Sequence, residues 1–309
     1  MPRPTTFTNA RTWPSTHATA GFCSTCSQQA ATRLIPPAGN LTYDGRHAYV
    51  YDAWNRMVAA KRAYRDASDT LHANVQVMAC AYDGLGRRIT KALTHSGYLD
   101  NTTHFYHDDQ RTIETRNGSD IWTTNYVLGL QYIDELIQIK HNTTSAGTQA
   151  ITTDDDEYFA LHDTMYSVIG IVDPAGDLVE RYEYTPYGQR TVFKPVDTLD
   201  TLCMAPSIYS QPVASETAGE FRPFGLCEFG HQGLMHDETV NLIYNRARML
   251  SPTTGRFMQR DPIGYPDGMN AYAAHHVMRG GLDASGMKLC INPKDQKLGQ
   301  IKTLVVTLA

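Results

Sequence analysis

The residues best suited to chemistry in this chain are two aspartates in short sequences near its C-terminal end. Asp261 opens the sequence D-P-I-G and Asp283 opens the sequence D-A-S-G, with residues 265–282 between them. Two carboxyl groups held close together cannot both ionise cheaply, so one keeps a proton while the other activates water. General acid–base help of this kind contributes about 10²–10⁴-fold to a rate. Arg260, beside the first aspartate, is expected to keep one carboxylate ionised or to stabilise an oxyanion.

Both sequences are also compatible with a simple turn. The sequence D-P-A-G that begins at Asp173 has the same form and lies between two stretches typical of strands, where a turn suffices. An aspartate side chain accepts hydrogen bonds from the backbone ahead of it, and glycine adopts a positive φ without steric cost. Chemistry and plain turn formation therefore both remain open for Asp261 and Asp283.

Other groups of reactive side chains predict little chemistry. Cys23 and Cys26 have the spacing of half a zinc site or a redox pair, but no second pair follows to complete four ligands. His275 and His276 would point apart in a strand, and the acidic residues 154–157 lack the alternating ligands and glycine of an EF-hand loop. No P-loop, dinucleotide fingerprint or G-x-S-x-G sequence is present. We therefore expect neither a bound metal nor a cofactor.

Composition restricts the class of protein further. The chain has 309 residues, 41% of them hydrophobic and 19% charged, which is typical of a folded domain rather than a disordered tail. Its formal net charge is −5 and its 27 basic residues are scattered, so we expect no nucleic-acid partner. No run approaches the roughly 18 consecutive apolar residues of a transmembrane helix. The first residues also lack the apolar region of a cleaved signal peptide.

From about Asn40 onward the sequence is typical of short antiparallel strands. Runs of β-branched and aromatic residues alternate with polar residues and are separated by Asp-Gly, Asn-Gly and Asp-Pro turns. The best-defined runs are residues 48–51, 75–78, 103–106, 122–127 and 178–184. Helical signals are few, the best being residues 269–278. The pattern predicts a mainly β fold.

A tyrosine–aspartate sequence recurs along this region. Residues 51–58 and 82–89 share the order aromatic, Asp, two residues, Asn or Gly, Arg, any residue, apolar, and looser copies begin at Tyr106 and Tyr184. In each copy the Asp opens a turn, the Asn or Gly takes a left-handed conformation and the Arg begins the return strand. Each copy thus predicts one β-hairpin, and successive hairpins must stack on one another.

The hairpin sequence resembles the hallmark of the Rhs or YD-repeat family. A more specific match follows in residues 233–248 and 251–264. They are similar to the Rhs-associated core, in which D-E-T-G-L-Y-Y-x-R-A-R-Y-Y-D-P-x-x-G-R-F leads to D-P-I-G. More than a dozen positions agree in order and spacing, and the resemblance covers roughly residues 40–286.

The resemblance implies a ribbon of antiparallel β-hairpins, a partial shell closed at one end by the core. It also implies autoproteolysis, because the family's signature is two D-P-x-G sequences at the separation found here. By this analogy an aspartyl-type pair, Asp261 and Asp283 with Arg260, cuts the chain next to Met287 in a single turnover. The sequence departs from the family pattern at Ala284, where the second D-P-x-G has proline, and at Ser251, where the core has aspartate.

Five segments are expected. Residues 1–38 form a disordered leader, 39–195 the hairpin ribbon, 196–230 a linker or insertion, 231–286 the Rhs-associated core with short helical segments, and 287–309 a short C-terminal tail. The ribbon is too short to enclose anything alone, so we expect a truncated core protein with a structural or encapsulating role. The family implies a secreted or cell-surface protein whose partners are a further Rhs or YD-repeat chain or an effector cargo.

Two other functions remain open. Exposed aromatic residues such as Trp54 and Trp122 would make the chain a surface module that binds carbohydrate or protein by stacking. Alternatively, the chain is a fragment of a longer Rhs toxin-delivery protein. An adjacent reading frame with more tyrosine–aspartate repeats would favour the fragment.

Overall fold

The computed structural model describes six stretches of the chain: residues 39–142, 156–197, 200–206, 225–265, 269–274 and 282–287. The expected leader with Cys23 and Cys26, His275, His276, residues 154–155 of the acidic run and residues 288–309 of the expected tail lie outside the described residues. The two aspartates with candidate chemistry, and the arginine beside one of them, all lie within them.

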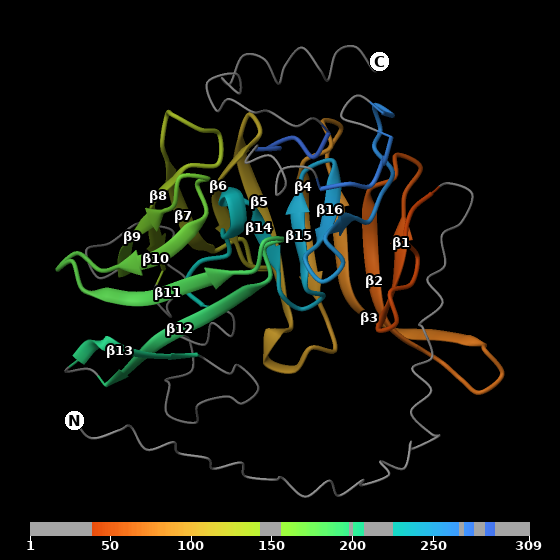
Figure 1. Cartoon of the computed structure of the whole chain (residues 1–309), viewed down its shortest axis with the longest axis horizontal. Coiled ribbons are helices and arrows are strands. Elements are labelled where there is room, and N and C mark those ends of the chain that lie inside the picture. The colour runs from red at the N-terminus through yellow and green to blue at the C-terminus, as the bar shows by residue number, and fades with distance from the viewer. Residues whose placement is uncertain are drawn as a thin grey trace, which may run out of the picture. The chain divides into compact units, whose positions relative to one another are not determined.

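The described chain is built from antiparallel strands in two sheets (Figure 1). In the larger sheet, thirteen strands pair in the order in which they follow in sequence, and β1 and β13 are its edges. The strands are β1 (His47–Tyr51), β2 (Met57–Arg65), β3 (Leu71–Tyr82), β4 (Arg88–Leu93), β5 (Asn101–Asp108), β6 (Arg111–Arg116), β7 (Trp122–Leu128), β8 (Leu136–His141), β9 (Asp156–His162), β10 (Val168–Val172), β11 (Leu178–Tyr184), β12 (Arg190–Asp197) and β13 (Asp200–Pro206). The predicted mainly β ribbon of antiparallel hairpins is confirmed.

The smaller sheet, here called the core sheet, is made by residues of the expected Rhs-associated core. It consists of β14 (Met235–Asp237), β15 (Leu242–Asn245), β16 (Arg248–Ser251) and β17 (Arg256–Phe257). Helical structure in the described residues is confined to two short 3-10 turns, η1 (Gly97–Leu99) and η2 (His231–Gly233). Residues 269–274 form turns and a β-bridge rather than a helix, because their carbonyl groups accept hydrogen bonds from the backbone of Phe257 and Asp261.

The hairpin turns have the geometry that the repeat predicts. Asp83 Oδ1 accepts hydrogen bonds from the backbone N–H groups of Leu85 and Arg87, both at 2.9 Å. Gly86 has a φ of +81°, and Arg87 Nε donates to Asp83 Oδ2 at 2.7 Å. The same pair of Oδ1 bonds recurs in the turns opened by Asp52, Asp66, Asn117, Asp163 and Asp173.

Arginines near these turns join one hairpin to the next. Three of them donate to a backbone carbonyl of the following turn: Arg56 to Asp83 at 3.1 Å, Arg87 to Asp109 at 2.7 Å, and Arg111 to Gly129 at 2.7 Å. We call these contacts the arginine ladder. Each rung bridges two hairpins that are separate in sequence, so the ladder fixes how successive hairpins stack.

The core sheet packs on one face of the larger sheet (Figure 1). Met249 lies in one apolar cluster with Met78 of β3, and Met235 lies in a second with Ile139 of β8. The backbone N–H of Leu41 also donates to the carbonyl of Met258 at 2.8 Å, which ties the start of the ribbon to the core. The region of the core therefore packs against the ribbon that precedes it.

The larger sheet continues past residue 195, where the sequence analysis ends the ribbon. β12 runs to Asp197 and pairs with β13, with a shift of register between Pro195 and Asp197. Proline lacks the N–H of a regular ladder and disrupts the strand pattern at this point. Residues 225–230, expected as the end of a linker, supply Cys227 and Phe229 to the apolar cluster around β8.

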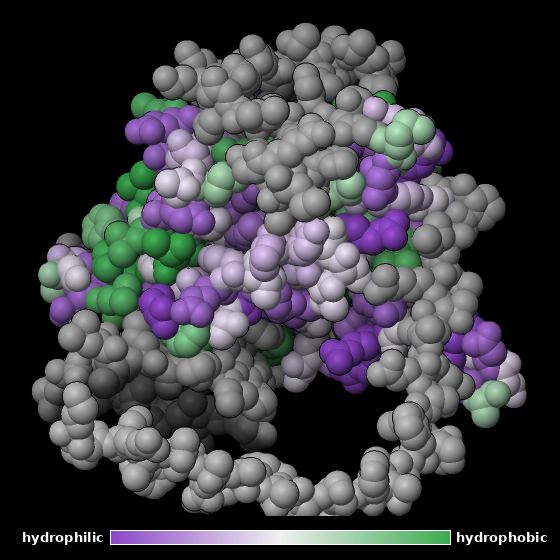
Figure 2. All heavy atoms as spheres, viewed as in Figure 1, coloured by the Kyte–Doolittle hydropathy of each residue, from purple (hydrophilic) through white to green (hydrophobic). Residues whose placement is uncertain are grey.

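Part of the surface of the larger sheet is apolar. Figure 2 shows hydrophobic residues gathered over β9 and β10, where Phe159, Leu161 and Ile169 are exposed. Within the described parts of the chain, no helix has the length and hydropathy needed to cross a bilayer. The three exposed apolar side chains named above belong to β9 and β10.

Candidate functional site

The two aspartates of the D-x-x-G sequences meet at one arginine of the core sheet. Arg248, in β16, is buried; its Nη1 lies 2.9 Å from Asp261 Oδ2 and its Nη2 lies 3.5 Å from Asp283 Oδ2. Its guanidinium lies over the Phe257 ring, 3.7 Å from the ring centroid. Both aspartates are buried as well. Both carboxylates thus contact the same guanidinium. The sequence alone predicts instead that the two carboxyl groups hold one proton between them.

Each aspartate also shapes its own turn. Asp261 Oδ1 accepts a hydrogen bond from the N–H of Ile263 at 3.0 Å, and Asp283 Oδ1 accepts one from the N–H of Met287 at 3.2 Å. In both, Oδ2 is left for the arginine. One oxygen therefore organises a turn and the other binds a guanidinium, as in the hairpin turns of the ribbon.

The turn opened by Asp283 is held by three consecutive residues, 246–248, which we call the carbonyl clamp. Its three residues donate hydrogen bonds to three successive carbonyl groups. Arg246 Nη1 donates to the carbonyl of Ala284, and Arg248 Nε donates to that of Gly286. Between them, the backbone N–H of Ala247 donates to the carbonyl of Ser285 at 3.3 Å. Contacts to three neighbouring peptide groups fix the orientation of each. The clamp therefore sets the backbone path of the chain as it leaves the core.

The peptide bond between Gly286 and Met287 is contacted at both of its ends. Arg248 Nε donates to the Gly286 carbonyl, and the Met287 N–H lies 3.2 Å from both Asp283 Oδ1 and Ser285 Oγ. A cation at the carbonyl oxygen stabilises the negative charge that develops when water adds to the carbonyl carbon. A carboxyl group beside the nitrogen is placed to hand a proton to the leaving amine. The contacts suit hydrolysis of this bond.

Position 286 requires glycine. Gly286 has a φ of +70°, a left-handed conformation that L side chains rarely adopt. A Cβ here would stand against the backbone oxygen of Asn245 and 3.2 Å from the backbone nitrogen of Arg248. The backbone of the turn therefore lies so close to the backbone of β15 and β16 that no side chain fits between them.

The carbonyl clamp also joins the site to the ribbon. Arg246 forms a two-pronged ion pair with Asp134, between β7 and β8, with Nη1 to Oδ2 at 3.0 Å and Nη2 to Oδ1 at 2.5 Å. Burial alone would lower the pKa of Arg246, but Asp134 raises it, so the guanidinium stays charged. Leu282 packs with Tyr132 of the same loop. The site is thus complete only when the core is docked on the ribbon.

Arg260, the third residue expected at the site, is exposed. Its Nη2 lies 3.3 Å from the hydroxyl of Tyr265, and its Cζ lies 5.5 Å from that ring's centroid. Side chains adjacent in an extended backbone point to opposite sides, so Arg260 faces outward when Asp261 faces the core. The cation that contacts both carboxylates is Arg248.

A second charged cluster links the two sheets. Arg88 Nη1, in β4, lies 2.5 Å from Asp237 Oδ2 at the end of β14, and Lys91 Nζ lies 3.3 Å from both Asp237 Oδ1 and Glu228 Oε1. Burial by itself raises the pKa of Asp237, but Arg88 and Lys91 together hold it below its usual range. The cluster is therefore a buried ionic link between ribbon and core.

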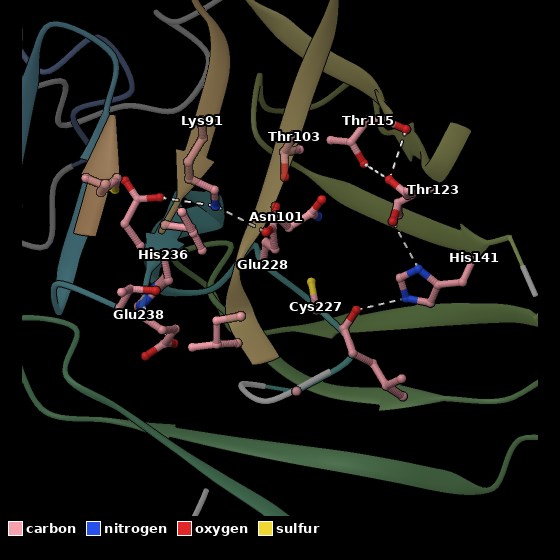
Figure 3. A pocket seen from close by; sticks show the side chains of 18 of the residues that line it. Lys91, Asn101, Thr103, Thr115, Thr123, His141, Cys227, Glu228, His236 and Glu238 are labelled. Atoms are coloured by element: carbon pink, nitrogen blue, oxygen red, sulfur yellow. Dashed lines mark hydrogen bonds and ion pairs between the residues drawn. The ribbon is translucent and has the colours of Figure 1, made fainter. Parts of the chain in front are cut away.

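A cavity of about 320 Å³, lined by both polar and apolar side chains, lies beside this cluster, between the larger sheet and residues 225–239 (Figure 3). Its walls carry hydroxyl, imidazole and charged groups that bind one another. Thr115 and Thr123 share a hydroxyl–hydroxyl bond of 2.9 Å, and His141 Nε2 lies 2.9 Å from the carbonyl of Leu226. His141 thus joins the ribbon to residues 225–239, whereas the threonine pair lies within the ribbon.

Two other expectations concern ligands. Trp122 is 2% exposed, so it offers no stacking surface, and the prediction of an exposed aromatic pair for carbohydrate is wrong for this residue. Trp54 is 75% exposed and has Arg56 Cζ 5.1 Å from its ring centroid. Among the side chains that the structure describes, no group of three or more His, Cys, Asp or Glu could hold a metal ion.

Comparison with known proteins supports an Rhs-related family for the chain. The tRNA3(Ser)-specific nuclease WapA of Bacillus spizizenii is 24% identical over 240 residues, and toxin protein Tse5 of Pseudomonas aeruginosa is 26% identical over 241 residues. These alignments cover 76% and 72% of this chain but 8% and 16% of the two relatives. The chain thus spans a small part of their length. No family model matches the sequence.

Solved structures share the fold. The crystal structure of TcdB2-TccC3-TEV matches with a TM-score of 0.53 and 16% identity, over 83% of this chain and 10% of that one. A Photorhabdus luminescens Tc holotoxin pore with a mutated TccC3 matches with a TM-score of 0.55 and 16% identity, over 82% and 11%. At this identity the likeness establishes the architecture alone.

Proposed function

We propose that the chain is a segment of a longer Rhs-type toxin protein, in which it forms part of the wall and the core, and that it cuts its own backbone once between Gly286 and Met287. One observation carries the proposal: Arg248 contacts Asp261, Asp283 and the Gly286 carbonyl at the same time. The similarity to WapA and Tse5 supports the first part of it.

The proposed reaction is a single hydrolysis. A water molecule adds to the carbonyl carbon of Gly286 while Asp261 takes one of its protons, and Arg248 stabilises the oxyanion. The C–N bond then breaks as the proton that Asp261 took from the water passes, by way of Asp283, to the Met287 nitrogen. The products are a carboxyl group on Gly286 and a free amine on Met287, and one water molecule is consumed.

Intact mass spectrometry of the purified full chain tests the cut. We expect the wild type to give one fragment that ends at Gly286 and one that begins at Met287, and we expect Asp261→Asn and Asp283→Asn to stay whole. Asp173→Asn is the matched control, because Asp173 opens a D-P-x-G turn in the ribbon, away from the core. A wild-type chain that stays whole under native conditions would contradict the proposal.

A purely structural role for the same residues is the second candidate. It is favoured by the turn geometry, since Asp83 in the ribbon divides its two oxygens between a turn and an arginine just as Asp261 and Asp283 do. In that case Arg248 would be a staple between two turns. Both aspartate variants would then lower the free energy of unfolding while every chain, including the wild type, kept its full mass.

Encapsulation of a cargo is the remaining part of the proposal. The sheet is open at β1 and β13, so further YD-repeat strands could extend the wall. When the chain is expressed within a longer Rhs-type parent, residues beyond Met287 should resist protease until the wall is unfolded. Equal protease sensitivity of that region before and after unfolding would argue against encapsulation.

A further inference from the structure

The residue opposite Arg248 in the core sheet is a buried carboxamide. In the register of β15 and β16, Asn245 pairs directly with Arg248. Opposite residues of an antiparallel pair carry their side chains on the same face, with Cβ atoms about 4.5–5.5 Å apart. Asn245 is 0% exposed, and neither Nδ2 nor Oδ1 has a hydrogen-bond partner among the described residues.

Much of this face of the core sheet is apolar. Ile243, Leu250 and Phe257 lie on it in one buried cluster. Besides Asn245, the face carries the polar groups around Arg248 and the side chain of His236, which pairs with Ile243 in the register of β14 and β15. An unsatisfied buried polar group costs about 1–3 kcal/mol, and native proteins commonly satisfy such groups with buried water. The position of Asn245 suits a water that also contacts the site.

The other buried amide of this region differs in this respect. Gln259 is 2% exposed, and its Oε1 accepts a hydrogen bond from the backbone N–H of Met249 at 2.8 Å. Gln259 therefore has a structural task within the core sheet. Asn245 has none among the described residues, and the backbone oxygen of Asn245 lies against Gly286, at the bond proposed to be cut.

We propose that Asn245 is a positioning residue that holds the attacking water of the self-cleavage reaction. The inference rests on the proposed function. The carboxamide oxygen accepts a hydrogen bond from one O–H of the water, and the other O–H of the water points toward Asp261, which takes that proton. A lone pair of the water oxygen then points at the carbonyl carbon of Gly286, where the new C–O bond forms as the C–N bond to Met287 breaks.

Three variants of the full chain test this role by the rate of cleavage after refolding, followed as intact mass over time. Asn245→Leu keeps the branched shape and the number of heavy atoms but cannot form a hydrogen bond to water, and we expect it to slow the cut about 10²-fold, as the loss of a positioned reactant does. Asn245→Ser keeps a hydroxyl and should restore part of the rate. Ile243→Val, on the same face, is the control for altered packing and should cut at the wild-type rate.

A readout independent of cleavage keeps folding defects apart from positioning. In crystals of the uncut Asp283→Asn chain, we expect a water molecule within hydrogen-bond distance of the Asn245 carboxamide, and we expect none when Asn245→Leu is added. If the wild type is cut and Asn245→Leu is cut equally fast, or if no water contacts Asn245, only this inference is overturned. If the wild type stays whole, the proposed function fails and the inference falls with it.

Discussion

Four aspartates that open turns, Asp52 and Asp83 in the ribbon and Asp261 and Asp283 at the core, use one carboxylate oxygen for the turn and the other for an arginine. In the ribbon the arginine follows four residues later, as Arg87 follows Asp83, so the pair can form within a single hairpin. At the core, Arg248 comes from another strand and serves both Asp261 and Asp283. The same local chemistry therefore yields a site that exists only in the folded chain.

Gly286 provides a test of how tightly the turn sits against the core. A Cβ at Gly286 would meet backbone of β15 and β16, whereas nothing lies within 4 Å of a Cβ at Gly176, whose φ is +91°. We expect Gly176→Ala to cost only the left-handed conformation, about 1–2 kcal/mol. Gly286→Ala should cost more and should also abolish the cut. Urea unfolding measures the loss of stability in each of the two variants. Equal losses would contradict the close approach of Gly286 to the backbone of β15 and β16.

Two buried histidines make the stability depend on pH. Burial lowers the pKa of His231 to about 4 and that of His236 well below its ordinary value. Both are neutral in the folded chain and gain protons on unfolding below about pH 6.5. Their contribution is therefore complete above that pH and is lost as the pH falls toward 4.

Urea unfolding between pH 7.5 and 5 measures this effect. We expect the free energy of unfolding to fall by up to about 1.4 kcal/mol per pH unit for each histidine. His236→Gln should flatten the slope, and His72→Gln, at a more exposed position on β3, is the control. A slope unchanged by His236→Gln would show that this histidine is not buried in neutral form.

The sequence points to both aspartates of the proposed site and to Arg260 beside them, whereas the cation that contacts both carboxylates is Arg248. Asp261 and Asp283 stand out because each opens a D-x-x-G sequence. Arg248 lies in the R-A-R part of the core match, but nothing in the sequence pairs β16 with two distant turns. Asn245 could be found only from the register of β15 and β16, because an isolated asparagine carries no pattern.

The arginine ladder operates at the scale of the hairpin. Arg87 binds Asp83 within its own turn and the carbonyl of Asp109 in the next, which requires the planar fork of a guanidinium. We expect Arg87→Lys to lose about 1–2 kcal/mol in urea unfolding because one ammonium cannot make both contacts. Arg181→Lys is the control: the exposed Arg181 side chain pairs with Glu183 and lies over the Phe193 ring, and its replacement should change the stability by less than about 0.5 kcal/mol. Equal losses of stability in the two variants would show that the arginine ladder does not stabilise the stacking of the hairpins.

Strands with alternating patterns are the ones that the sequence predicts. The run at 178–184 coincides with β11, and the run at 75–78 falls within β3. β9 escapes prediction because its residues are exposed or half-buried throughout, so no apolar face marks it. The continuation of β12 beyond residue 195 is not predicted either, because a proline is not typical of a strand that pairs on both sides. Turn chemistry is therefore a better guide to this fold than strand composition.

At the scale of the whole molecule, the docking of core on ribbon depends on a buried ionic link. Arg88 and Asp237 side chains are each 1% exposed, and removing one partner of such a pair costs about 3–5 kcal/mol. We expect Arg88→Met to lose that much in urea unfolding, measured in the uncut Asp283→Asn chain. Lys140→Met, which breaks the more exposed pair with Glu157, is the control and should lose less than about 1 kcal/mol.

Loss of the ionic link between Arg88 and Asp237 should also lower the rate of self-cleavage. The carbonyl clamp depends on Asp134 of the ribbon through Arg246, so a core that undocks would release the turn at Gly286. We therefore expect Arg88→Met to slow cleavage in the otherwise wild-type chain. An undiminished rate would mean that the core sheet forms the site without the ribbon.

The central claim is that the folded core cuts its own chain at one bond through Asp261 and Asp283. Intact mass spectrometry of the wild type refolded from denaturant, sampled over time beside Asp283→Asn, tests it most directly. We expect the full-length mass to disappear only in the wild type, where one fragment ending at Gly286 and another beginning at Met287 replace it. Full-length mass that persists in both, or loss of mass that is the same in both, would contradict it.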